Sequence, residues 1–278
     1  MSTRHDTRPP AVPDIRLIVT DMDGTLLDVD GNVPAGLWPL LEELGRRGIV
    51  FSPASGRQYA TLAHLFEGAD EGMVYIAENG ALVVRDGVEL SSDPVDPAVS
   101  ARLVSCVRQL AAEGRNVGVV VCGKRAAYTE RGDEAFLAEV ARYYRAHRVV
   151  DDATAVDDEI IKIAVLDFDG AEHGSARALE AFSDTHQVVV SGELWTDVMN
   201  RTADKGAAVR RLQQHLGIGP EQTMVFGDYL NDLQMLDTAD WSFAMANAHP
   251  DILRRARHTA PAHTDEGVLR TIKDVLGI

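Results

Sequence analysis

The sequence predicts an α/β protein in which a doubly wound parallel sheet carries a smaller, inserted α+β domain. Three observations predict this class. Apolar runs of strand length alternate with helix-like segments over residues 15–80, which is typical of a parallel sheet covered by helices. Over residues 81–191 several strand-like runs follow one another without a helix between them. The alternation then resumes at Lys205, so the chain leaves the first domain and later returns to it.

The first part of the parallel sheet is predicted from residues 15–80. Leucines recur at helical spacing between Leu37 and Leu44, and Gly48 ends that helix. Short apolar runs stand on either side of it and read as buried strands. The predicted elements are strand 15–20, helix 34–47, strand 49–54, helix 59–67 and strand 73–77.

The inserted domain is predicted from its adjacent strands. Arg85-Asp86-Gly87 joins two apolar runs and is typical of a hairpin turn. Gly123-Lys124-Arg125 joins a second pair in the same way. The predicted elements are strands 81–84, 88–91, 117–121, 126–129, 160–166 and 188–191, with helices 97–112, 134–145 and 175–182. We place the core at residues 15–90 and 198–278 and the inserted domain at residues 91–197.

The last part of the chain restores the strand–helix alternation. The predicted elements are helix 205–216, strand 223–226, strand 241–245 and helix 267–276. They complete the parallel sheet that the first part begins.

The composition excludes several classes of partner. The 278 residues carry a net charge of −16 at pH 7, whereas surfaces that bind nucleic acid or anionic membranes are normally basic. The apolar runs are too short to span a bilayer. Residues 1–14 are polar, which predicts a disordered lead-in and no signal peptide. With only Cys106 and Cys122 as cysteines, we expect reduced thiols and a cytoplasmic protein, acting as a monomer or a dimer.

Two carboxylates stand at the end of the first predicted strand. Asp21 and Asp23 share one rim of the sheet, because alternate strand residues point to the same face. Gly24 lets the backbone turn, and Thr25 is suited to capping the next segment. Ligands bind at the carboxyl ends of parallel strands. Two acids there suit a nucleophile and a neighbouring acid/base, with a divalent cation to offset their repulsion.

The same short pattern occurs a second time. Asp167-Phe168-Asp169-Gly170 also follows an apolar run, but Ala171 stands where Thr25 follows Gly24. The adjacent strands place this copy in the inserted domain. We therefore expect Asp167 and Asp169 to be exposed turn acids without a catalytic role.

Further polar residues occupy equivalent places on the parallel sheet. Ser55 follows the second strand, Lys205 opens a helix, and Asp228 and Asp232 follow a late strand. All are expected to converge at the carboxyl rim. Phosphoryl transfer needs a carboxylate nucleophile, a cation, and a lysine and a hydroxyl to hold the phosphoryl oxygens. Ligands that are all acidic oxygens suit Mg²⁺.

These segments together resemble the haloacid dehalogenase superfamily. The chain is similar in particular to Cof-type phosphatases, in which a large type IIB cap lies between motifs two and three. The resemblance covers nearly all of residues 15–276. It rests on D-M-D-G-T-L-L at residues 21–27, S-G-R at 55–57, D-K-G at 204–206, G-D-Y-L-N-D-L-Q-M-L at 227–236, F-A-M-A-N-A at 243–248 and D-E-G-V at 265–268.

The resemblance implies a role for each matching residue. Asp21 is the expected nucleophile, and Asp23 the acid that protonates the leaving group and then the base that deprotonates water. Ser55 and Lys205 are expected to grip the phosphoryl group. The resemblance also implies that Mg²⁺ is held by Asp21, the Asp23 backbone carbonyl, Asp228 and Asp232, the last through its support of the metal shell or through water. The remaining expected phosphate or substrate contacts are Gly24, Thr25, Gly56, Arg57 and Asn231.

The expected reaction is hydrolysis of a small phosphomonoester, with the cap selecting the substrate. The resemblance favours a sugar phosphate, and pyridoxal phosphate, a nucleotide or a flavin phosphate stay open. Candidate cap contacts are Lys124, Arg125, Lys162, Glu193 and Asp197. Two alternatives stay open. A phosphotransferase such as a phosphomutase uses the same nucleophile, and a silent sensor of phosphorylated ligands keeps the fold without turnover. Arg57 is equally suited to an internal ion pair, and Asn79 to a turn beside Gly80.

Overall fold

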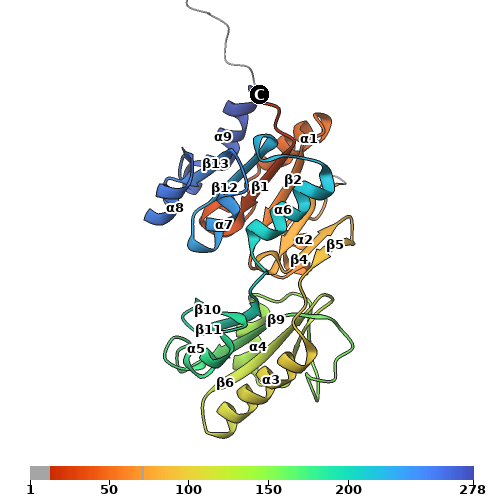
Figure 1. Ribbon diagram of the computed structural model, residues 1–278, viewed down its shortest axis with the longest axis vertical. Helices are drawn as coiled ribbons and strands as arrows, with labels where there is room; N and C mark the ends of the chain where they lie inside the picture. The colour runs from red at the N-terminus through yellow and green to blue at the C-terminus, as the bar shows by residue number, and fades with distance from the viewer. Residues whose placement is uncertain (1–12, 70–71) are drawn as a thin grey trace, which may run out of the picture.

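The computed structural model describes residues 13–69 and 72–278, which form two parts (Figure 1). The larger part is built on an eight-stranded sheet and the smaller on a six-stranded sheet. The predicted α/β class is confirmed. Residues 1–12, most of the predicted lead-in, lie outside the described residues. Within the described ranges no helix is both long and apolar enough to cross a membrane.

The eight-stranded sheet is parallel over most of its width. Its order is β14-β13-β12-β1-β2-β3-β4-β5. All pairs from β14 to β3 are parallel, and β4 and β5 are antiparallel additions. Every residue of β1 is buried, as expected for a central strand covered on both faces. The strands are β1 Leu17–Asp21, β2 Val50–Ala54, β3 Val74–Ala77, β4 Leu82–Arg85, β5 Val88–Ser92, β12 Thr223–Gly227, β13 Trp241–Met245 and β14 His258–Ala260.

The helices of the larger part place their apolar stripes on this sheet. In α1 the four leucines that predicted the helix are all buried. In α6 the first turn is capped by the Asp204 carboxylate, which accepts the N–H of Ala207 at 2.7 Å. This hydrogen bond at the helix N-terminus fixes where the helix starts and therefore where Lys205 lies. The helices are α1 Leu37–Arg46, α2 Tyr59–Leu65, α6 Lys205–Leu216, α7 Leu233–Leu236, α8 Pro250–Arg255 and α9 Gly267–Leu276.

The smaller part is a six-stranded sheet between helices. Its order is β10-β11-β9-β6-β7-β8, antiparallel except for the β7–β8 pair. Val119 and Val121 of β6 pack with α3, whereas Val120 packs with α4, so the two helices cover opposite faces. The elements are α3 Pro97–Ala112, β6 Val117–Gly123, β7 Ala127–Thr129, α4 Glu134–Ala141, β8 His147–Val149, β9 Ile160–Asp167, α5 Ser175–Ala178, β10 His186–Gly192 and β11 Trp195–Asn200.

Short 3₁₀ turns, together with the tight turn Met22–Leu26, complete the fold. The 3₁₀ turns are Glu78–Gly80, Glu180–Phe182, Pro220–Gln222, Leu230–Asp232 and His263–Asp265. The chain leaves the larger part after β5 and returns through β11 into α6 (Figure 1). The predicted limits of the inserted domain, residues 91 and 197, fall inside β5 and β11.

Hydrogen bonds join the two parts beside β2. The side-chain amide of Gln58 donates to the carbonyl of Ala146 and accepts its N–H, both at 3.0 Å. The Thr61 hydroxyl donates to the carbonyl of Tyr143 at 3.1 Å. Gln58 directly follows the Ser55-Gly56-Arg57 segment, so the smaller part is attached next to one of the predicted site motifs.

Candidate active site

The candidate site begins where β1 ends. Asp21 is the last residue of the strand and is buried, while the Asp23 carboxylate two residues later is largely exposed. Gly24 turns the chain between them and Thr25 with φ of +78°. A Cβ atom on Gly24 would lie 2.5 Å from Oδ2 of Asp228. Glycine is therefore required here both by the left-handed backbone and by the approach of Asp228.

Lys205 brings its ammonium group into the same place. Its side chain is fully buried, and Nζ donates to Oδ1 of Asp21 and, at 2.7 Å, to Oδ1 of Asp232. Burial acts to lower the pKa of Lys205, but the two carboxylates beside it outweigh burial and raise that pKa. Lys205 is therefore a permanent cation in contact with Asp21.

Asp228 and Asp232 form the other side of the site. Oδ2 of Asp232 accepts the N–H groups of Asp228 and Tyr229 at 3.0 and 3.1 Å. With Oδ1 bonded to Lys205, both oxygens of the buried Asp232 carboxylate already have donors. Oδ1 of Asp228 accepts the Thr25 hydroxyl at 2.9 Å. Asp232 thus fixes the loop and the lysine, while Asp228 keeps more of its carboxylate free.

Three carboxylates gather round one ammonium. One oxygen each from Asp21, Asp228 and Asp232 lies within 4.8 Å of the others. Burial raises the pKa of Asp21 well above its ordinary value, against the pull of Lys205. Burial also raises the pKa of Asp228, against its bond from Thr25. An all-oxygen set with excess negative charge fits a hard divalent cation such as Mg²⁺, because a cation would stabilise the ionised form of both groups.

Asp23 and Ser55 have local partners. The Arg57 guanidinium binds the Asp23 carboxylate through two nitrogens, with the Nε–Oδ2 distance 3.0 Å. This contact is the main reason that the pKa of Arg57 is raised. The internal ion pair, one of the two alternatives for Arg57, is therefore present. The buried Ser55 hydroxyl accepts the N–H of Arg57 at 3.2 Å, which shapes the turn that also contains Gly56.

Two asparagines add to the site. Nδ2 of Asn231 donates to Oδ1 of Asn79 at 3.2 Å, and the Asn79 amide lies against Gly56. Asn79 has the left-handed φ of +54° expected of a turn, yet its side chain links two predicted site segments. Asn247 donates to the carbonyl of Gly24 at 2.8 Å. Asn247 lies in a segment that resembles a family motif, but the sequence did not predict this contact.

The second Asp-x-Asp-Gly copy differs from the sequence-based expectation. Asp167 is fully buried, so the prediction that it is an exposed turn acid is wrong; Asp169 is exposed as predicted. Asp167 accepts from Arg115 at 2.9 Å and from the N–H groups of Asp169 and Ser175. Its carboxylate is held by donors within the smaller part, which accounts for its burial in physical terms.

The candidate cap contacts separate into two groups. Lys162 and Asp197 lie together, buried, 3.7 Å apart, and Lys162 reaches Glu78 of the larger part. The others are more exposed: Lys124 pairs with Glu89 and Glu159, Arg125 pairs with Asp157 and Asp158, and Glu193 is exposed at the β10–β11 turn. The structure thus brings only Lys162 and Asp197 of this set together.

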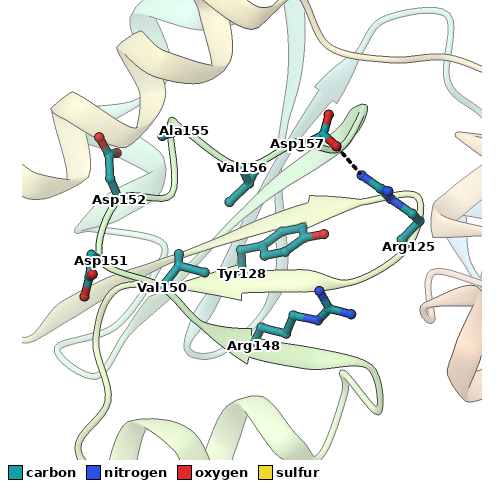
Figure 2. Close-up of a pocket in the computed structure, with 9 residues that line it drawn as sticks. All are labelled: Arg125, Tyr128, Arg148, Val150, Asp151, Asp152, Ala155, Val156 and Asp157. Carbon is teal, nitrogen blue, oxygen red and sulfur yellow. Dashed lines mark ion pairs between the residues drawn. The ribbon is translucent and has the colours of Figure 1, made fainter.

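A cavity of about 530 Å³ opens elsewhere in the smaller part (Figure 2). Arg125 and Arg148 flank Tyr128 on one side, and the loop of residues 150–157 closes the other. None of its nine lining residues belongs to the carboxylate cluster. This cavity is therefore separate from the carboxylate cluster at the end of β1.

The chain is similar to known proteins over almost its whole length. A family model described as haloacid dehalogenase-like hydrolase matches residues 18–272. The chain is 31% identical over 265 residues to the 5-amino-6-(5-phospho-D-ribitylamino)uracil phosphatase YbjI of Escherichia coli, a match that covers 94% of this chain and 96% of that protein. It is 26% identical over 245 residues to the HMP-PP phosphatase of Cronobacter sakazakii, covering 87% and 88%.

Solved structures share the fold. A haloacid dehalogenase-like hydrolase from Bacteroides thetaiotaomicron superposes with a TM-score of 0.81 at 21% identity, covering 94% of this chain and 99% of that one. One from Bacillus subtilis gives 0.78 at 24% identity, covering 93% and 99%. The order of motifs along the sequence, the family match over almost the whole chain and the phosphatase relatives lead to one assignment. This chain belongs to the haloacid dehalogenase-like hydrolases and is a Cof-type phosphatase.

Proposed function

We propose that the protein is a Mg²⁺-dependent phosphatase that hydrolyses a small phosphomonoester through an aspartyl-phosphate. The observation that carries this proposal is the contact of the buried Lys205 ammonium with Asp21 at the end of β1, beside Asp228 and Asp232. A carboxylate nucleophile, a fixed cation and a metal-suited oxygen set are what phosphoryl transfer needs.

The proposed reaction has two steps. An oxygen of Asp21 attacks phosphorus, the bond from phosphorus to the leaving oxygen breaks, and Asp23 gives that oxygen its proton. Water then attacks phosphorus and gives a proton to Asp23, the Asp21–phosphorus bond breaks, and inorganic phosphate leaves. The exposure of Asp23 supports its role, because the group must meet both an alcohol and water. In both steps Lys205 and Ser55 hold the non-bridging oxygens.

The metal site in this proposal uses Asp21, Asp228 and the backbone carbonyl of Asp23. Mg²⁺ supplies positive charge that offsets the carboxylates and the developing phosphoryl charge. Asp232 supports this site by orienting Lys205 and the Asp228 backbone, because both of its oxygens are already bonded. Gly24, Thr25, Gly56, Arg57 and Asn231 complete the surroundings of the phosphate.

We further propose that the inserted domain is a cap that selects the leaving group of a sugar phosphate or a similar metabolite, in the cytoplasm, with the enzyme a monomer or a dimer. The phosphatases related to this chain act on small phosphorylated compounds, as the names of the Escherichia coli and Cronobacter relatives state. The attachment of Tyr143 and Ala146 next to Arg57 supports a cap that works over the phosphate site.

The direct test is turnover of 4-nitrophenyl phosphate, with 4-nitrophenol and free phosphate measured together. We expect equal release of both in the presence of Mg²⁺. Release of 4-nitrophenol without matching phosphate would indicate transfer to another acceptor, and no turnover at any Mg²⁺ concentration would indicate the silent sensor. With ³²P-labelled 4-nitrophenyl phosphate, we expect label to stay on the protein after acid quenching. The absence of this label in Asp21→Asn would identify the covalent step.

A further inference from the structure

A buried charge cluster crosses from the cap to the core beside the phosphate site. Glu78 follows β3 in the core and is 1% exposed, and Lys162 lies in β9 of the cap and is 3% exposed. Their charged atoms are 2.5 Å apart. Asp197 on β11 and the ring of Tyr144 hold the ammonium from the cap side, at 3.7 Å from Oδ2 and 5.4 Å from the ring centre.

Glu78 depends on this lysine. Within residues 13–69 and 72–278, neither carboxylate oxygen of Glu78 accepts a well-aligned hydrogen bond. A buried charge is strongly unfavourable unless it is paired, and the Lys162 ammonium is the cation that pairs with Glu78. If the cap moved away, it would remove that balance from a residue of the core.

Glu78 also begins a strained turn. Glu78 and Asn79 have consecutive left-handed backbones, with φ of +50° and +54°. Asparagine adopts this conformation readily in turns, whereas for a glutamate it is uncommon and persists where the surroundings enforce it. Lys162 contacts the side chain of the first residue of this turn.

The turn contacts three segments of the phosphate site. The N–H of Glu78 donates to the carbonyl of Arg57, and the N–H of Asn79 to the carbonyl of Ser55, at 3.1 and 2.9 Å. Gly80 packs so closely on the backbone before Lys205 that a Cβ atom would lie 2.4 Å from the Asp204 carbonyl oxygen. The Asn79 side chain accepts from Asn231. A shift of the turn therefore displaces several of the groups that hold phosphate.

From this chain of contacts, and resting on the proposed phosphatase function, we propose that Lys162 is a positioning residue for the core. Its ammonium holds Glu78, and through Glu78 the turn that aligns Ser55, Arg57 and Lys205. The phosphate site is then complete only when the cap is seated, so that the cap prepares the chemistry as well as choosing the substrate.

The test is a double-mutant cycle with Lys162→Met and Glu78→Gln, assayed on 4-nitrophenyl phosphate and glucose 6-phosphate. We expect each single change to lower kcat at least tenfold, by the same factor on both substrates. The double variant should be no slower than the slower single variant, because Lys162 acts through Glu78. Should Lys162→Met not fold, the isosteric Glu78→Gln alone must still show the same loss of kcat on both substrates.

Arg115→Met is the matched control, because it also leaves a buried cap carboxylate, Asp167, without its cation. It should lower the melting temperature and leave kcat within twofold. An equal loss of kcat in this control would show that the loss in Lys162→Met comes from general destabilisation, and it would overturn the proposal. Two results for Lys162→Met would contradict the proposal: a loss of kcat that differs tenfold between the two substrates, or a loss that is undiminished when Glu78→Gln is already present. Either would indicate that Lys162 contacts the leaving group instead. If the wild type hydrolyses neither substrate, the phosphatase proposal fails, while non-additive melting temperatures in the same cycle still test the Lys162–Glu78 pair.

Discussion

Nζ of Lys205 and Oδ1 of Asp232 lie 2.7 Å apart, both side chains fully buried, and the other oxygen of Asp232 receives two backbone N–H groups. A carboxylate whose oxygens are all bonded in this way holds a lysine and a loop in place. It has less capacity left for a metal than Asp228, which receives one side-chain donor. The two acids of this loop are therefore not equivalent.

Replacing these two acids should separate their roles. We expect Asp228→Asn to raise the Mg²⁺ concentration for half-maximal activity at least tenfold more than Asp232→Asn does. Asp232→Asn should instead lower stability, by about 3–5 kcal/mol if the bond to Lys205 is lost. Magnesium titrations and urea unfolding of both variants check this. The reverse order of metal affinity would assign direct coordination to Asp232.

The two Asp-x-Asp-Gly copies should differ in what they contribute. Asp21→Asn should abolish turnover, because an amide is a poor nucleophile, whereas Asp167→Asn should stay within a few-fold of the wild-type rate. Because Asp167 is buried and accepts three donors, its replacement should lower the melting temperature. Aryl-phosphate turnover and thermal unfolding are measured side by side. An inactive but stable Asp167 variant would contradict the assignment of the site.

Magnesium should stabilise the protein more at neutral than at acidic pH. Burial raises the pKa of Asp21 and of Asp228, so without metal the folded state binds protons more tightly than the unfolded chain. Their contribution to stability is then lost as the pH rises from about 3.9, the unfolded value, through the raised values.

A divalent cation binds the ionised carboxylates and offsets this loss. We expect 10 mM Mg²⁺ to raise the melting temperature by several degrees at pH 7.5 and by much less at pH 5. Ca²⁺ should bind but inhibit turnover, because its larger and more flexible shell disturbs in-line geometry. Differential scanning fluorimetry with a chelated control gives the result, and full activity after chelation would remove the metal from the proposal.

The glycine after Asp23 should be irreplaceable. In Gly24→Ala the new Cβ meets the Asp228 carboxylate at 2.5 Å and the backbone has φ of +78°, so we expect kcat to fall at least tenfold. Gly170→Ala is the matched control, since Gly170 has φ of +101° and nothing within 4 Å of the added carbon. Both variants carry backbone strain of about 1–3 kcal/mol, and only the first should lose activity. Equal rates in the two variants would show that contact with Asp228 is unimportant.

Local patterns predict much of this fold. Helices α3, α6 and α9 and strand β13 begin and end at the predicted residues, because caps and apolar spacing define them within a short window. The sequence predicts none of β8, β11 and β14. In β11 the buried Thr196 and Asp197 break the apolar pattern; their partners, Ser175 and Lys162, lie far away in the sequence.

The candidate site residues also differ in this respect: some are predicted from local sequence, and others depend on partners far away in the sequence. Asp21, Lys205, Asp228 and Asp232 are recognisable from motifs at strand and helix ends, and the structure brings them together. The burial of Asp167 could not be predicted, because its cation Arg115 is 52 positions away. Gln58 shows no local signal either, since its partner is a backbone group in the cap.

The contact between Gln58 and the backbone of residue 146 has an evolutionary consequence. Gln58 recognises the N–H and the carbonyl of residue 146 and does not read its side chain. Every amino acid except proline offers those two groups. Substitutions at position 146 other than proline therefore keep both groups that this attachment uses. If the inserted domain selects the substrate as proposed, the side chain at position 146 can change with the substrate while the two parts stay joined beside the Ser55-Gly56-Arg57 segment.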